Sequence, residues 1–404
     1  LIVTSGGVAV RLSVMQENLA KGLSIVGRAV SSRSTLPVLS NILLSTDEDR
    51  LKLAATNLEV GVSCWLGGQI EDDGAVTLPA RLLTDWVNSM QAGRIDMELS
   101  VRTMSVHLRS GRSESNIKGI DASEFPLIPT ADGEQPLGLP PATIRQIIDQ
   151  VAFAAADAKD TSRPALTGVL AKFEGDRLTL AATDGYRLSV RRTLLPAAAP
   201  ADTTIIIPAR SLAEVSRISG EADPDRPVDF VVAGARNQIL FRLYGKGEGD
   251  KGGAFHQVDL VSQLIDAKFP DFNAIIPKNC VTRTVLDTAA LLRGLKVASL
   301  FARDASDRVV FTITPGADTE PGQLTIHATS QEAGDNVSDL DALVEGTPVE
   351  IAFNVRYLMD VMNVIDTPQV VLETTRSDRP GVIRPVGTGP EEFTHVIMPM
   401  QIQK

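Results

Sequence analysis

The sequence predicts an α+β chain made of three copies of one domain, each with helices able to cover one face of antiparallel sheets. A first anchor recurs as Leu-Lys-Leu-Ala-Ala-Thr-Asn from Leu51, Leu-Thr-Leu-Ala-Ala-Thr-Asp from Leu178 and Leu-Thr-Ile-His-Ala-Thr-Ser from Leu324. A second anchor, a hydrophobic residue followed by two residues and Arg, begins 27, 29 and 29 residues later. Three copies in phase are hard to obtain by chance. The period of about 125–145 residues is a common domain size, so each copy can bury its own core.

Short polar, turn-rich stretches separate the three copies. Asp132–Pro136 follows the first copy, and the segment Ile276–Asn279 precedes the third. Such clusters of Gly, Pro, Asn and Asp mark connections between folded segments. We therefore predict domains at 11–132, 133–277 and 278–404. Residues 1–10 lack the basic start and long apolar stretch of a signal peptide, and we expect a tag remnant or a disordered leader there.

Two helices are predicted in each copy. The first helices fall within 13–33, 142–159 and 286–303, where apolar residues recur at the spacing of one helical face. The second helix starts at the second anchor, where Pro79 and Pro208 suit a first helical turn because proline loses no hydrogen bond there.

Alternating apolar residues and turn signals predict strands between and after these helices. The strands are expected at 40–46, 51–56, 95–99, 105–109, 167–174, 177–183, 229–232, 238–244 and 369–374. The repeat is thus a helix, two strands, a second helix and further strands.

Charge is unevenly distributed along the chain. The formal net charge of the 404 residues is −11, which taken alone disfavours binding to nucleic acid. The six predicted helices nevertheless sum to +5, so the remainder sums to −16. A basic helix layer would bind phosphates without reading sequence, although cationic helix surfaces also serve solubility alone. Aromatic content of 4% disfavours single-strand binding by base stacking.

The sequence carries no motif for catalysis, a cofactor or a metal. We expect Cys64 and Cys280 to be two buried thiols in a reducing cytoplasm. Asp184 lies in a glycine turn and is expected to stabilise that turn rather than act in catalysis. No apolar run reaches the ~18 residues of a membrane span. The four histidines, expected to be surface or structural groups, are His107, His256, His327 and His395.

Five ordered motifs resemble the bacterial replicative sliding clamp family, the β subunit of DNA polymerase III. The likeness runs from about Arg11 to the C-terminus. The motifs are Arg33-Ser-Thr-Leu-Pro37, Ala182-Thr-Asp-Gly-Tyr-Arg-Leu188, Phe269-Pro-Asp-Phe272, Phe353-Asn-Val-Arg-Tyr-Leu358 and Val396-Ile-Met-Pro-Met400.

The resemblance implies a non-catalytic, cytoplasmic DNA polymerase III accessory subunit. Two chains would pair head-to-tail into a six-domain ring, with helices facing a central hole and sheets outside. The implied partners are double-stranded DNA, the replicative polymerase, an ATP-driven clamp loader, and other proteins with a clamp-binding peptide, such as repair polymerases, ligase and mismatch repair proteins. A scaffold that binds only proteins remains an alternative, as does, more remotely, an enzyme with a pocket between domains.

The resemblance also implies one hydrophobic peptide-binding pocket per chain, which accepts a Gln and a Leu-Phe-like end. By position it comprises Leu166, Thr183, Gly185, Tyr186, Arg187, Leu188, Pro270, Ile275, Asn354, Tyr357, Val396, Ile397, Met398, Pro399 and Met400. Arg187 is expected to orient the peptide. Ala274 replaces a frequent Arg, Tyr186 replaces a frequent His, and the tail ends in Gln401–Lys404, so the preferred peptide is left open.

The same resemblance assigns DNA-facing and dimer positions. Pro164 and Ala165 stand where some relatives carry aromatics, which would weaken one DNA contact. The DNA-facing residues are Lys21, Arg28, Arg33, Arg145, Arg210, Arg217, Lys296 and Arg303. The expected dimer interface includes Ile117, Leu300 and Phe301.

Overall fold

A computed structural model divides the chain into two compact units. Unit 1 comprises Leu1–Arg145 and Glu214–Leu264, and unit 2 comprises Gln146–Ala213 and Ile265–Lys404. Both units therefore take part of the middle repeat. The structure describes residues 10–31, 35–130, 135–233, 237–246, 254–303, 306–317, 321–389 and 392–402.

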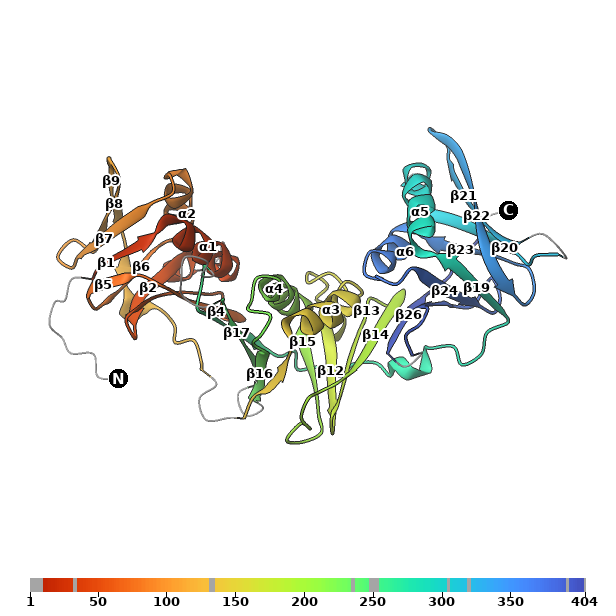
Figure 1. The fold of residues 1–404 in the computed structure, drawn as a ribbon, viewed down its shortest axis with the longest axis horizontal. Helices are drawn as coiled ribbons and strands as arrows, with labels where there is room; N and C mark the ends of the chain where they lie inside the picture. Colours follow the sequence, from red (N-terminus) through yellow and green to blue (C-terminus); the bar gives the residue numbers. More distant parts are fainter. Residues whose placement is uncertain are drawn as a thin grey trace. The chain divides into compact units, whose positions relative to one another are not determined.

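The same order of elements occurs three times, and it can be followed along the chain in Figure 1. Each repeat is a strand, a helix and three strands, followed by a second such set; the first repeat adds two short strands, β5 and β10. The helices are α1 (Gln16–Val26), α2 (Ala80–Ser89), α3 (Pro141–Ala152), α4 (Ala209–Ser219), α5 (Thr288–Ala302) and α6 (Val355–Met362).

Unit 1 contains two antiparallel sheets. The five-stranded sheet has the order β5 (Gln69–Asp72), β1 (Arg11–Met15), β7 (Arg94–Ser100), β8 (Ser105–Ser110), β9 (Ser113–Lys118). The nine-stranded sheet has the order β10 (Ile120–Asp121), β6 (Ala75–Pro79), β2 (Asn41–Asp47), β3 (Arg50–Thr56), β4 (Val60–Leu66), β18 (Gln257–Gln263), β17 (Gln238–Tyr244), β16 (Val228–Ala233), β11 (Leu137–Leu139). The β4–β18 pair joins strands of the first and second repeats.

Unit 2 contains one twelve-stranded sheet. Its order is β15 (Thr203–Pro208), β12 (Gly168–Glu174), β13 (Arg177–Thr183), β14 (Arg187–Leu194), β26 (Phe393–Ile397), β25 (Gly381–Pro385), β24 (Gln369–Thr374), β19 (Thr282–Asp287), β22 (Gly334–Glu345), β21 (Gly322–Ser330), β20 (Arg308–Thr314), β23 (Val349–Asn354). The β14–β26 pair joins strands of the second and third repeats.

Helices pack on the sheets through apolar faces. In unit 1, α1 packs closely on β3 and β4. The close approach is seen at Gly22, where an added Cβ atom would lie 2.9 Å from the Leu53 side chain and 2.8 Å from the Leu66 side chain. In unit 2, α5 and α6 cover a core in which the Phe311 and Phe353 rings meet edge to face, with centroids 5.8 Å apart. Helix caps fix the starting points of α5 and α6: the Asp287 carboxylate accepts the N–H of Ala290, and the Asn354 side chain accepts the N–H groups of Arg356 and Tyr357.

The fold class is confirmed, with three differences in detail. At least four strands, and not the predicted two, separate the two helices of each repeat, as β12 to β15 do between α3 and α4. Each repeat opens with a strand before its first helix, which the sequence analysis missed because strands as short as β11 or β1 show too few alternations. The first helices are also shorter than predicted. Beyond Ala152 the chain turns with tighter hydrogen bonds, such as Ala154 N–H to Val151 O at 3.0 Å. The domain boundaries stay a prediction.

The two cysteines differ in environment. Cys64 on β4 is buried, and burial raises the pKa of its thiol. Cys280 is exposed, so the prediction of two buried thiols is wrong for Cys280. It lies just before β19 in the turn-rich Pro277–Val281 segment, where few side chains cover it. None of the helices in the described part of the chain is long and apolar enough to cross a membrane.

Candidate functional site

The turn between β13 and β14 is fixed by its own side chains. The Thr183 hydroxyl donates to Arg187 O at 2.6 Å and accepts from Gly185 N–H at 3.1 Å. One Asp184 carboxylate oxygen accepts the N–H groups of Tyr186 and Arg187 at 2.9 and 3.0 Å. Gly185 has φ +95°, a conformation that favours glycine. Asp184 therefore stabilises the turn, as the sequence predicts.

Arg187 joins this turn to the third repeat. Its side chain is 9% exposed, and its Nε donates to Asp184 Oδ2 at 3.0 Å. Nη1 donates to Asp360 Oδ2 on α6 at 2.5 Å, and Nη2 donates to Phe153 O at 2.8 Å. The guanidinium also stacks 4.3 Å from the centre of the Tyr357 ring. Because all three nitrogens donate within the chain, Arg187 holds the turn against α6 and Phe153. Its expected role in orienting a peptide stays a prediction.

The C-terminal tail runs along the same turn. Leu188 faces Val396 in the β14–β26 register. Beyond β26, Met398 N–H donates to Tyr186 O at 2.8 Å, and Met400 N–H donates to Ala352 O at 2.8 Å. The tail is therefore held on both sides by backbone hydrogen bonds, which fixes the exposed Met398 side chain beside the turn.

The predicted pocket residues form a buried layer and an exposed rim, all within unit 2. The buried members are Thr183, Leu188, Val396 and Ile397. The partly buried members are Leu166, Arg187, Asn354, Tyr357, Pro399 and Met400. The exposed members are Gly185, Tyr186, Pro270, Ile275 and Met398.

The rim is unusually apolar for exposed surface. Tyr186 is 62% exposed, Met398 is 40% exposed and Ile275 is 38% exposed. Ala274, next to Ile275, is also exposed. The Phe269–Ile276 segment packs through Phe272 on the cluster that contains Leu188 and Val396, which brings it to this surface. Exposed apolar side chains on a fixed base are typical of a protein-binding surface.

His395 lies beneath this surface and was not predicted as part of it. Its Nδ1 is 2.7 Å from the Ser189 hydroxyl, and its ring stacks on Phe153 with centroids 5.5 Å apart. Burial, aided by the charge of Arg187, lowers the pKa of His395 to about 3, so the ring is neutral. Nothing in the local sequence signals this burial, because it arises only when β26 pairs with β14.

Several predicted DNA-facing cations have acidic partners in unit 1. Lys21 forms an ion pair with Glu221. Arg28 Nη1 lies 3.1 Å from Glu214 Oε1, and Arg217 Nε lies 2.9 Å from Glu214 Oε2. The Arg28 side chain remains 59% exposed. Part of the positive charge is therefore neutralised locally.

The remaining predicted cations and dimer residues differ in exposure. Arg33 lies outside the described residues. Arg145, Arg210, Lys296 and Arg303 are exposed. Among the expected dimer residues, Leu300 on α5 is 57% exposed, Phe301 is partly buried, and Ile117 on β9 is 3% exposed. Ile117 thus packs within its own unit, and Leu300 is the residue of this set with the most exposed surface.

The described residues contain no group of three or more His, Cys, Asp or Glu side chains placed to hold a metal ion.

The three repeats have counterparts among known proteins. Family profiles of the DNA polymerase III beta subunit match three stretches: the N-terminal domain over residues 10–129, the central domain over 138–271 and the C-terminal domain over 273–401. The Beta sliding clamp of Synechocystis sp. is 31% identical over 411 residues, which cover 97% of this chain and 99% of that relative.

Solved structures agree over the whole length. The DNA polymerase sliding clamp from Bacillus subtilis has a TM-score of 0.85 at 26% identity and covers 98% of this chain and 100% of its own. The sliding clamp from Pseudomonas aeruginosa bound to griselimycin has a TM-score of 0.83 at 27% identity, with the same coverage. With three matched domains and near-complete coverage, this chain belongs to the family of the DNA polymerase III beta subunit, the bacterial sliding clamps.

Proposed function

We propose that two copies of this chain close head-to-tail into a six-domain ring that encircles double-stranded DNA and tethers replication proteins to it. The observation that carries the proposal is the surface beside the β14–β26 pair, where the second repeat meets the third. We call this place the second junction, and the β4–β18 pair between the first and second repeats the first junction. At the second junction an exposed apolar rim stands on a base fixed by Arg187 and by the β14–β26 pair. A surface held this firmly can bind a peptide without first being ordered, which reduces the entropic cost of binding.

The rim suits a short peptide with apolar side chains. Met398 is adaptable, and Tyr186 offers a broad ring with a polar end. The proposed partners are the replicative polymerase, the clamp loader and repair, ligase or mismatch-repair proteins that carry a clamp-binding peptide. In keeping with its membership of the sliding clamp family, we assign the chain a non-catalytic role in the cytoplasm.

DNA contact in this proposal is weak and independent of sequence. Exposed cations such as Lys296 and Arg303 would meet phosphates. Arg28 and Lys21 have carboxylate partners, so phosphates must compete with these groups. Weak, exchangeable contacts allow the protein to move along the duplex, while closure of the ring prevents it from leaving.

A topological experiment tests the ring. The chain is loaded by its ATP-driven loader onto nicked circular DNA and onto linear DNA of equal length, and retention is measured by gel filtration. We expect retention on the circle and rapid loss from the linear molecule, because only free ends allow a ring to slide off. Equal retention on both molecules would overturn encirclement, and no retention on either would favour a scaffold that binds only proteins.

The dimer is tested separately. Leu300→Asp places a charge at the most exposed of the predicted interface residues and should shift the mass in solution from dimer to monomer. Leu127→Asp is the matched control, since Leu127 is 97% exposed outside the predicted interface. An unchanged dimer in Leu300→Asp would remove α5 from the interface.

A further inference from the structure

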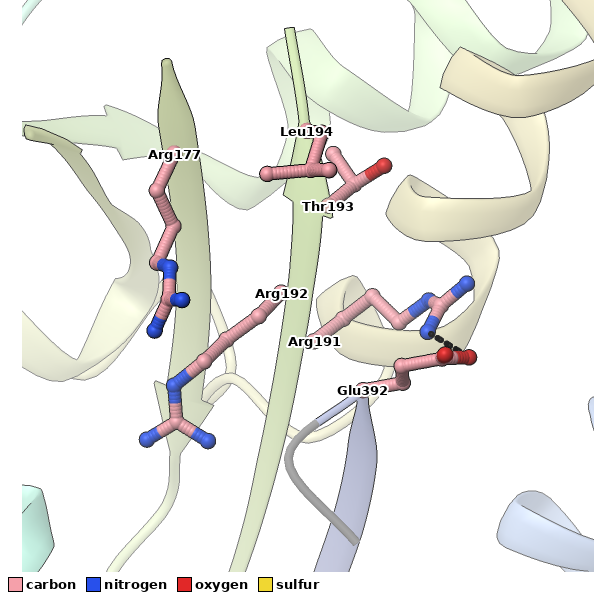
Figure 2. A pocket seen from close by; sticks show the side chains of 6 residues that line it. All are labelled: Arg177, Arg191, Arg192, Thr193, Leu194 and Glu392. Carbon is pink, nitrogen blue, oxygen red and sulfur yellow. Dashed lines mark ion pairs between the residues drawn. The ribbon is translucent and has the colours of Figure 1, made fainter. Parts of the chain in front are cut away.

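The cavity beside the end of β14 does not gather its charges on one face of the sheet. Its volume is about 460 Å³. Arg191 and Arg192 follow each other on β14 and therefore point to opposite faces. Figure 2 shows Arg192 beside Arg177 on one side of the strand, and Arg191 with Glu392 on the other. These arginines do not converge on one ligand, whereas three charged side chains on the helices of unit 1 do act on one another.

Glu214 on α4 is shared by two of the predicted DNA-facing cations. Its Oε1 lies 3.1 Å from Nη1 of Arg28, which belongs to the turn Gly27–Ala29 at the end of α1. Its Oε2 accepts a hydrogen bond of 2.9 Å from Nε of Arg217, three residues further along α4. Each arginine thus binds a different oxygen of the same carboxylate, so that two positive charges share one negative charge.

The two arginines differ in their access to solvent. The side chain of Arg28 is 59% exposed, whereas that of Arg217 is 26% exposed. The Nη2 atom of Arg217 is buried and has no hydrogen-bond partner among the described residues. A phosphate in solution cannot reach that buried atom, but it can reach most of the Arg28 guanidinium. Arg28 is therefore the cation that can change its partner, and Arg217 is the one that stays with Glu214.

Sharing lowers the cost of such an exchange. When Arg28 turns to a phosphate, Glu214 keeps Arg217 as its counter-ion. A largely enclosed carboxylate that is left without any cation is strongly disfavoured, so the second ion pair matters. The ion pair that has to open is the exposed one, and exposed ion pairs contribute little free energy. A phosphate can thus replace Glu214 as the partner of Arg28 without leaving an enclosed charge unpaired.

The neighbouring ion pair between Lys21 and Glu221 lacks a second cation. Lys21 lies on α1 and is 32% exposed, and Glu221 follows the end of α4. Glu221 has no other cationic partner among the described residues. Loss of Lys21 to a phosphate would leave this carboxylate alone, so Lys21 is less free to exchange than Arg28. The shared carboxylate is what distinguishes Arg28.

We infer that Glu214 and Arg217 control the contact of Arg28 with duplex DNA. Arg217 anchors the carboxylate, and Arg28 alternates between that carboxylate and a DNA phosphate. This inference rests on the proposed function, and it makes Arg217 a positioning residue rather than a direct DNA contact. Because Glu214 remains beside Arg28 and competes for it, each phosphate contact is short-lived, which favours movement along the duplex.

The central test is Glu214→Gln, which removes the competing charge and keeps the shape of the side chain. Binding of a fluorescently labelled linear duplex is measured by anisotropy over a series of salt concentrations. We expect the affinity at low salt to rise about twofold to fivefold, as the loss of one exposed competing ion pair allows. The plot of log affinity against log salt should steepen by about one, because one more cation is then free to release counterions from the DNA.

Arg217→Gln separates positioning from direct contact. In the native background it should weaken duplex binding about twofold to fivefold, because Glu214 then has only Arg28 and holds it more firmly. In the Glu214→Gln background the same change should leave the affinity as it is, since no carboxylate remains to be anchored. Arg28→Gln should cancel the gain of Glu214→Gln. A loss from Arg217→Gln that persists without Glu214 would show a direct phosphate contact and overturn the positioning role.

Glu71→Gln is the matched control. Glu71 pairs with Arg11 on β1, outside the predicted DNA-facing set. This variant has the same net charge as Glu214→Gln but should bind the duplex like the native chain. An equal gain in both variants would mean that net charge alone sets the affinity, which would overturn the role of Glu214. An acidic peptide that gains as much affinity as the duplex in Glu214→Gln would overturn the assignment to DNA in favour of a protein partner.

Failure of the ring and failure of this inference have different signatures. Equal retention on circular and linear DNA would overturn encirclement but leave the comparison of variants valid, because binding to a linear duplex requires only contact. An unchanged affinity and salt dependence in Glu214→Gln would overturn the exchange of partners, even if the loaded chain stays on the circle. The absence of duplex binding in every variant would overturn it as well.

Discussion

The two junctions between repeats use the same backbone device but different side chains. In unit 1, β4 pairs with β18 through aliphatic neighbours such as Val62 with Leu260, while ion pairs such as Arg28 with Glu214 lie outside the sheet. In unit 2, β14 and β26 also share aliphatic neighbours, such as Leu188 with Val396, but polar and enclosed contacts that centre on Arg187 are added to them.

The difference shows how one repeated module acquires two roles. Backbone pairing with aliphatic packing is sufficient to continue a sheet, and it leaves few exposed side chains for a partner protein to bind. Polar contacts in a low-dielectric interior demand partners in fixed positions. The second junction is therefore more specific in geometry, and it positions the exposed rim that we propose as the binding surface.

The largest expected effect is at Arg187. Arg187→Ala leaves Asp184 and Asp360 without their shared cation, and we expect the local stability of β14 and β26 to fall by about 3 kcal/mol. Hydrogen exchange measured strand by strand would show the loss in β14 and β26 but not in β4 and β18. Affinity for the pocket peptide should fall as well. An equal loss at both junctions would contradict their independence.

Acid should weaken the second junction before the first. Folded His395 has a pKa of about 3, whereas an unfolded histidine titrates near 6.5, so between these values only the unfolded chain binds the proton. Stability is therefore fully present above pH ~6.5 and falls as the pH drops toward 3, by up to about 1.4 kcal/mol per pH unit. His395→Asn should flatten this slope in hydrogen exchange of β26. His107→Asn, an exposed control, should leave it unchanged.

The first junction should be sensitive to a buried hydroxyl. Cys64→Ser replaces a thiol that faces Val258 with a group that needs a hydrogen bond, and we expect β4 and β18 to lose about 1–2 kcal/mol. Exchange rates in β14 and β26 should stay as they are. Cys280→Ser is the control, because its thiol is exposed. If the Cys64 and Cys280 variants behave alike, the aliphatic character of this junction is unimportant.

The smallest effect is expected at Arg28. Arg28→Ala removes an ion pair whose cation is 59% exposed, and the stability of unit 1 should change by less than about 0.5 kcal/mol. Urea unfolding followed at the first junction measures this change. A loss comparable to that of Arg187→Ala would mean that the exterior ion pairs also hold the first junction together.

The sequence predicts the repeat and the residues of the rim, but not the contacts beneath them. In-phase anchors reveal a copied module because they are local and recur, and the Thr183–Arg187 turn is readable from its Asp and Gly. Two partners of Arg187 are distant in sequence: Phe153 lies 34 residues before it and Asp360 lies 173 residues after it. In the sequence, His395 is one of four scattered histidines, and its burial follows only from the pairing of β26 with β14. Such side-chain roles depend on pairing across long stretches of chain, which no local pattern records.

The last strand of the sheet has a consequence for synthesis. β26 leaves the ribosome after both β14 and β25, yet it is the only described strand that joins these two strands in the sheet. Until β26 has been made and paired, the nascent chain exposes the edge of β14 and lacks Met398. A chain without β26 would thus offer an incomplete binding surface, so that partners would assemble only with molecules in which this strand is in place.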